Sequence, residues 1–214
     1  MNNAKKIVVL VSGGGTNLQA LINAQNAGEL GCGKISCVIS SKADAYALTR
    51  AENAGIKTRV IIRKDYADIA SYSLAIRDAL IEEGADLVVY AGFMIILDES
   101  VYQAFPNKMI NVHPALIPSF CGKGYYGLHV HEEALKKGVK VSGATVHFVT
   151  AECAAGPIIL QKAVEVADDD TPETLQRRIM EQAEWQILPR AVRLFCEDRI
   201  SVENGIVRIK QQEG

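Results

Sequence analysis

The sequence predicts an α/β fold in which a doubly wound, mostly parallel sheet has an antiparallel addition in its C-terminal half. Apolar runs of strand length alternate with amphipathic segments of helix length through the first half of the chain, which is the pattern of βαβ units. In the second half, two strand-like runs at residues 139–149 and 156–166 follow each other closely, and the first contains the alternating stretch GATVHFV. These two runs predict an antiparallel pair added to the sheet.

Four apolar runs in the first half are bounded by turn residues and predict strands at residues 6–12, 34–41, 57–63 and 85–92. The segments between them predict helices at residues 16–27, 43–54 and 65–83. Gly55 and Gly84 follow the second and third of these helices, where C-terminal glycines are common. This half is expected to form a lobe of the nucleotide-binding type.

The second half opens with the strand KMINV and continues into a loop rich in proline and glycine, from Pro114 to Gly127. A helix is expected at residues 130–137, before the antiparallel pair. The last long helix should run from about Pro172, at a first helical position, to Cys196. A hairpin around Asn204 and Gly205 ends the chain.

Length and composition predict one domain over residues 1–214, with lobes at about 1–105 and 106–214, because 214 residues with 49% hydrophobic content suffice for one sizeable core. The 23 basic and 25 acidic residues give a net charge of −2, so we expect a small-molecule partner and no nucleic acid.

The apolar stretch at residues 7–11 is too short for a signal peptide or membrane span, which predicts a cytoplasmic location and no membrane partner. Five cysteines without a CxxC pair argue against a disulfide framework and a thiolate zinc site.

The glycine run SGGG lies between the first strand and the first helix, where backbone N–H groups and the helix dipole can bind an anion such as phosphate. No Lys-Ser/Thr pair follows the glycines, so the run is not a P-loop. Leu18 occupies the third glycine position of the dinucleotide fingerprint, which argues against a nicotinamide cofactor. The alternative is a simple tight turn in which Thr16 or Asn17 caps the helix.

Asn111 and His113 end an apolar run and share one face of the predicted strand. An amide and an imidazole at the carboxyl edge of a sheet can both donate to an oxygen that becomes negative during acyl transfer. The alternative is that the two side chains only satisfy carbonyl groups of the following loop. His147 either faces the same cleft or fills the sheet, and the pair His129 and His131 lacks a third ligand, so no metal is predicted.

Four segments of the chain resemble the phosphoribosylglycinamide formyltransferase family of folate-dependent formyltransferases. They are SGGGTNLQ, AGFM at residues 91–94, NVHPALIPSFCGKGYYG, and GATVHFV with the following GPIILQ. The resemblance extends in order over residues 6–195. It implies the Rossmann-like formyltransferase fold and an enzyme of purine synthesis that transfers a formyl group from 10-formyltetrahydrofolate to the amine of glycinamide ribonucleotide.

The resemblance also implies roles for single residues of this chain. Gly15, Thr16, Asn17 and Glu184 match the segments that bind the ribonucleotide. The stretch of Met94, Ile95, Ile96 and Leu97 matches the folate pocket, and Asn111 and a protonated His113 match the catalytic pair that stabilises the oxyanion, with Asn111 also close to the folate.

Three positions depart from the family pattern. The family has a catalytic aspartate at the position of Ala154, and its absence predicts strongly reduced turnover with intact binding. Glu152, two residues away, is a candidate partial substitute. Ile95 stands where many members have an arginine beside the folate. A second, upstream arginine of the family also has no counterpart, because its position is Ile69, so Arg63 or Lys64 would have to reach instead.

Three alternatives to this function remain open at the level of sequence. A methionyl-tRNA formyltransferase is expected to have an additional C-terminal domain, and a formyltetrahydrofolate hydrolase an additional N-terminal domain, for which 214 residues leave no room. A noncatalytic binder of nucleotide or folate is the third, and Ala154 favours it. The chain is expected to be a monomer or a homodimer.

Overall fold

The computed structural model describes residues 4–151 and 156–211, and its centre is a seven-stranded sheet of order β3-β2-β1-β4-β5-β6-β7. Five strands are parallel: β1 (Lys5–Val11), β2 (Gly33–Ser40), β3 (Lys57–Val60), β4 (Leu87–Tyr90) and β5 (Met109–His113). The last two, β6 (Val141–Phe148) and β7 (Ile158–Glu165), are antiparallel to their neighbours. The predicted fold class, with its antiparallel addition, is confirmed.

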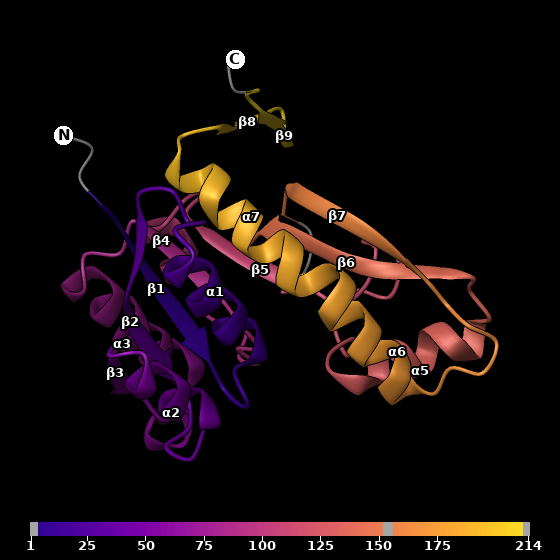
Figure 1. Ribbon diagram of the computed structural model, residues 1–214. Coiled ribbons are helices and arrows are strands. Elements are labelled where there is room, and N and C mark those ends of the chain that lie inside the picture. The colour runs from indigo at the N-terminus through magenta and orange to yellow at the C-terminus, as the bar shows by residue number, and fades with distance from the viewer. Residues whose placement is uncertain (1–3, 152–155, 212–214) are drawn as a thin grey trace.

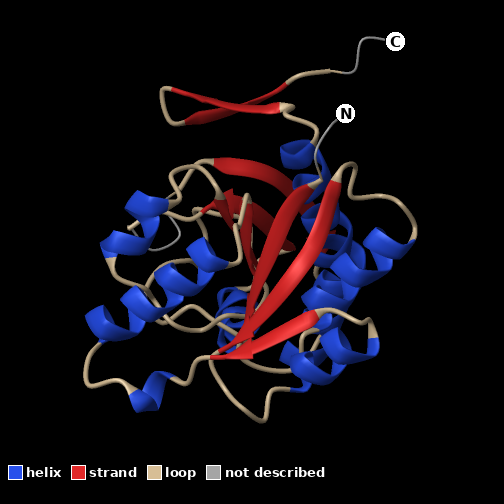
Figure 2. Ribbon diagram, turned by 90° about the vertical axis from the view of Figure 1, so that its left-hand side faces the viewer, coloured by secondary structure: helices blue, strands red, loops and turns tan. Residues whose placement is uncertain are grey.

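Helices cover both faces of the sheet, as Figure 2 shows. Ile7, Val9 and Val11 of β1 pack in one buried cluster with α1 (Thr16–Asn26), α2 (Tyr46–Asn53), α6 (Pro172–Ile179) and α7 (Trp185–Cys196). Val8 and Leu10 point the other way, into a cluster with α3 (Ile69–Glu82) and α4 (Glu99–Ala104). Because successive side chains of a strand alternate between faces, a strand buried on both faces must be apolar throughout. This explains the unbroken apolar run of β1.

Several boundaries differ from those predicted. The helix expected at 65–83 begins only at Ile69, because Asp68 accepts a hydrogen bond from the Ser71 backbone at 2.7 Å and caps it. The residues before it form a 3-10 turn, Arg63–Asp65. The edge strand β3 ends at Val60 because it pairs with only four residues of β2, Cys37 to Ser40. Helix α4 was not predicted.

The predicted C-terminal helix exists but changes its hydrogen-bonding pattern in the middle, between α6 and α7 (Figure 1). Thr171 and Thr174 form a reciprocal capping box that starts α6. The segment Met180–Glu184 is π-helical, and Pro189, which has no N–H to donate, follows within α7. π-Helical turns often occur at functional sites, and this one contains Glu184.

The predicted C-terminal hairpin is also present. Strands β8 (Ile200–Glu203) and β9 (Ile206–Ile209) pair antiparallel around Asn204 and Gly205. Both turn residues have positive φ, 51° and 77°, as a type I′ turn requires. Helix α5 (Leu128–Lys137) packs beside α6, at the opposite end of the molecule from this hairpin (Figure 1). In the part of the chain that the structure describes, no helix has the length and apolar character needed to cross a membrane.

Candidate active site

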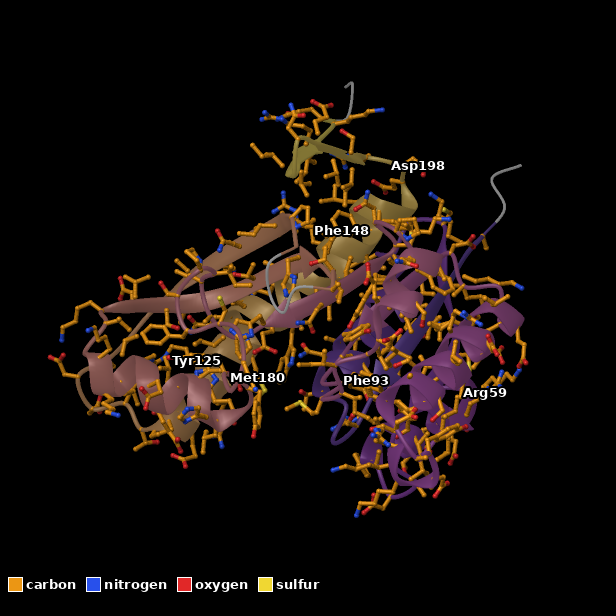
Figure 3. All side chains as sticks on the ribbon, turned by 180° about the vertical axis from the view of Figure 1, so that it is seen from behind. Arg59, Phe93, Tyr125, Phe148, Met180 and Asp198 are labelled. Atoms are coloured by element: carbon orange, nitrogen blue, oxygen red, sulfur yellow. The ribbon has the colours of Figure 1, made fainter. Side chains whose placement is uncertain are left out.

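A cleft of about 670 Å³ opens at the carboxyl ends of β1, β4 and β5. Its lining comes from both halves of the chain: Phe93 belongs to the first half, and Tyr125 and Met180 to the second, as labelled in Figure 3. The volume is within the range of about 300–1,000 Å³ that is typical of small-molecule sites. The sheet edge where the sequence predicted a site therefore has a cleft of suitable size.

The N-terminus of α1 contributes Thr16 and Asn17 to the cleft. The helix is capped by Gly15 and not by Thr16 or Asn17, and among the described residues no side-chain cap satisfies the free backbone N–H groups of its first turn. Gly15 has φ +74°, and a Cβ there would lie 2.6 Å from the Ala47 side chain, so only glycine fits. Gly15 itself does not line the cleft; it shapes a helix end suited to an anion.

Glu184 lies beside this helix end and is buried. Its carboxylate accepts a hydrogen bond from Asn17 Nδ2 at 2.7 Å, although the two residues are 167 positions apart in the chain. Burial raises the pKa of Glu184 to about 7, and the Asn17 hydrogen bond opposes this shift only in part. The structure thus joins Asn17 and Glu184, two of the four residues that the resemblance assigns to the ribonucleotide.

Replacing Glu184 with glutamine should remove a pH-dependent loss of stability. A carboxyl group whose pKa is higher in the folded protein lowers the free energy of unfolding as pH rises from about 4.5 to about 7. The reason is that the unfolded chain releases the proton at the lower pH. Glu184→Gln should therefore raise the free energy of unfolding by up to about 3 kcal/mol at pH 8 and change it little at pH 4. Urea denaturation across this pH range measures the difference, and parallel curves for the two proteins would contradict it.

Asn111 is held in place by a histidine on the neighbouring strand. Asn111 of β5 and His147 of β6 are directly opposite each other, and Asn111 Nδ2 lies 3.3 Å from His147 Nε2. His147 Nδ1 lies 2.9 Å from the carbonyl of Phe148, which can only accept, so Nδ1 carries the hydrogen and Nε2 accepts from the amide. One amide hydrogen of Asn111 is thereby used, and the second has no acceptor among the described residues.

His113 is buried at the same end of β5, and its Nε2 lies 2.8 Å from the carbonyl oxygen of Phe120. Nε2 must therefore donate, which leaves Nδ1 as the acceptor in the neutral ring. Burial lowers the pKa of His113, and the Phe120 hydrogen bond opposes this shift in part. The neutral ring is favoured, which is opposite to the protonated His113 that the resemblance implied.

The loop that supplies the Phe120 carbonyl is fixed to the sheet by Thr145. The buried Thr145 hydroxyl donates to the Ala115 carbonyl at 2.7 Å and accepts from the Ile117 amide at 3.1 Å. Gln161 of β7 donates to the same hydroxyl and to the Ile117 carbonyl, both at 3.0 Å. Phe120 then adopts φ 48°, an unusual conformation for a residue other than glycine. The position of the Phe120 carbonyl, which bonds His113, thus depends on a hydrogen-bond network that extends to β6 and β7.

The structure also places the three histidines whose roles the sequence left open. His147 faces the cleft, and so does His131, which is buried and has no hydrogen-bond partner for either ring nitrogen within the described residues. Burial, and to a lesser degree the charge of His113, lowers the pKa of His131 to about 4. His129 instead lies at the surface, 3.2 Å from Glu132. No group of three or more metal-ligating side chains that could hold an ion is found in the described ranges.

The segment predicted to contact folate lines the cleft except at its end. Met94, Ile95 and Ile96 line it, and the Met94 amide donates to Ser12 Oγ at 3.2 Å, which ties the segment to the end of β1. Leu97 is 4% exposed and lies in the core, so its predicted folate contact is not supported. A folate contact of Arg63 or Lys64 is not supported either, because neither residue lines the cleft. The Arg63 guanidinium donates instead to the Tyr66 carbonyl.

Ala154 and Glu152, the two positions on which the predicted loss of turnover depends, lie outside the described residues.

Comparison with known proteins agrees with this geometry. The family model described as formyl transferase matches residues 5–192. A phosphoribosylglycinamide formyltransferase of Haemophilus influenzae is 41% identical over 94% of this chain and 92% of its own. A bovine trifunctional purine biosynthetic protein is 44% identical over 94% of this chain, which spans 19% of that protein. The crystal structure of glycinamide ribonucleotide transformylase 1 from Symbiobacterium toebii has a TM-score of 0.92 and 43% identity, covering 99% of this chain and 96% of that one.

Proposed function

Because the chain belongs to the formyl transferase family, among its phosphoribosylglycinamide formyltransferases, we propose that it transfers a formyl group from 10-formyltetrahydrofolate to the amine of glycinamide ribonucleotide. The observation that carries the proposal is the arrangement at the end of β5. Asn111, whose amide is oriented by His147, and His113 line one cleft with Thr16 and Asn17 of the open helix end. A phosphate at the helix end would direct the rest of a nucleotide along the cleft.

The proposed reaction needs no protein nucleophile. The ribonucleotide amine attacks the formyl carbon, a C–N bond forms, and the carbonyl oxygen becomes an oxyanion that the free amide hydrogen of Asn111 can stabilise. Neutral His113 accepts the amine proton at Nδ1. The oxyanion then re-forms the carbonyl as the bond from the formyl carbon to N10 of the folate breaks, and N10 takes up the proton from His113, which leaves formylglycinamide ribonucleotide and tetrahydrofolate.

The apolar wall of Met94, Ile95 and Ile96 supports binding of a folate ring in the same cleft. Met94 and Ile96 are 54% and 60% exposed, a large apolar surface for single side chains to present to solvent. This supports an aromatic ligand, and the fixed backbone of the segment supports a preformed site. We further propose that the substrates bind while turnover is strongly reduced, because Ala154 takes the place of the family aspartate.

Binding and turnover, measured side by side, test this function. We expect calorimetry to show binding of glycinamide ribonucleotide and of a nonreactive formyl-folate analogue, and a spectrophotometric assay to show slow formation of tetrahydrofolate that depends on the ribonucleotide. Tetrahydrofolate formation without the ribonucleotide would indicate a hydrolase instead. Binding of both ligands with no transfer would favour the noncatalytic binder, which Ala154 makes the second candidate.

The remaining expectations stay predictions. They are a single domain over residues 1–214, a cytoplasmic location, and a monomer or homodimer without nucleic acid.

A further inference from the structure

Lys123 is the one lysine or arginine among the described residues that line the cleft. The other charged group there, Glu184, has a pKa near 7 and is buried at the α1 end. Arg50, which lies close to the glycine run, is turned to other partners: its Nε donates to the Gly14 carbonyl at 2.7 Å and its guanidinium stacks over Tyr46. The positive charge available to a ligand in this cleft therefore comes from one side chain.

The loop around Lys123 has a constrained backbone and is anchored at both ends. Gly122 and Gly124, on either side, have φ 95° and 92°, a region that other residues rarely adopt. Two residues on, the Tyr125 ring packs against Phe120, with ring centres 6.3 Å apart, and stacks on His129 at 6.0 Å. The loop is thus held on one side by the Phe120 that bonds His113, and on the other by α5. Lys123 itself is exposed and has no ion pair with any described residue.

Both proposed substrates are anions, a phosphate monoester and a folate with a glutamate tail. Ile95, at the position where the family often has an arginine, brings no charge to the folate side. The helix end at Thr16 brings backbone donors but no side-chain cation to the phosphate side. Resting on the proposed function, we propose that Lys123 is a specificity-determining residue that binds an anionic group of one substrate, either the phosphate or the glutamate carboxylate.

Substrate affinities of a charge-neutral variant test the role of Lys123. Lys123→Gln should weaken the binding of one of the two ligands about tenfold in calorimetry at low ionic strength, because a charge-assisted hydrogen bond is lost. The difference should shrink as salt is added, and Lys123→Arg should restore most of the affinity. Lys137→Gln, at an exposed position of α5 outside the cleft, makes the same charge change and should leave both affinities unaltered.

Truncated ligands then identify the group that Lys123 binds. If it is the phosphate, the loss in Lys123→Gln disappears when glycinamide ribonucleoside replaces the ribonucleotide. If it is the glutamate, the loss disappears with a pteroate analogue that has no glutamate. Unchanged affinities for both complete ligands, or the same loss with a ligand and its truncated form, would overturn the inference alone. Failure of the unaltered chain to bind either substrate would overturn the proposed function and this inference with it.

Discussion

Replacing Ala154 with aspartate is expected to raise the rate of formyl transfer by about 10²- to 10⁴-fold, the range typical of a positioned acid-base group. The physical reason lies in His113, whose pKa is lowered by burial; among the described residues the one group that opposes this shift is the neutral Phe120 carbonyl. A carboxylate near the ring would stabilise the imidazolium that forms when His113 accepts the amine proton. The steady-state kcat, with both substrates saturating, measures the gain.

Two controls separate the charge from other effects of the Ala154 substitution. Ala154→Asn matches aspartate in size but has no charge, and it should recover little of the rate. In a His113→Ala background the aspartate should give almost no gain, because it acts through the imidazole. If Ala154→Asp left kcat unchanged, or raised it equally without His113, position 154 would not limit the reaction in the way proposed.

Asn111→Ala is expected to lower kcat by about 10²- to 10³-fold, with small changes in substrate affinity. The amide is proposed to donate to an oxygen that is negative only during the reaction, so the loss should fall on the chemical step and not on binding. Single-turnover kinetics in the Ala154→Asp protein, where the rate is large enough to follow the loss, give this comparison.

The Asn111 prediction has its own matched variants. Asn53→Ala, at an exposed position near the end of α2, should leave kcat unaltered. His147→Gln should cause a smaller loss than Asn111→Ala, because the amide remains but its partner is changed. An equal rise in the dissociation constants, with kcat retained, would mean that Asn111 only binds substrate.

The predictable part of the fold was the part with a strong local pattern. Unbroken apolar runs gave the parallel strands, and Pro172 at a first helical position gave the start of α6. Helix α4 has only six residues, too few for a helical period to stand out from the surrounding loop. The π-helical segment depends on packing in the middle of a long helix, which no local pattern indicates.

The candidate site was predictable as single residues but not as pairs. Alternation placed Asn111 and His113 on one strand face, yet their partners come from elsewhere in the chain: His147 through the register of β5 and β6, and Phe120 through the loop. The register between two strands depends on the whole sheet, so it cannot be predicted from the sequence of either strand alone. Glycine-rich loops likewise have no period, so nothing in the sequence pointed to Lys123 as a cleft residue.

The fixing of the 114–120 backbone by Thr145 has a consequence for how this site can evolve. The hydrogen bonds to Ala115 and Ile117 set the position of Phe120 whatever the length of the chain that follows. Insertions and deletions between residues 121 and 127 would then reshape the cleft rim, where Lys123 lies, while the bond from Phe120 to His113 stays intact. Ligand preference should therefore be able to vary without disturbing His113, the proposed proton acceptor, because the Phe120 carbonyl that bonds it lies before the variable part of the loop.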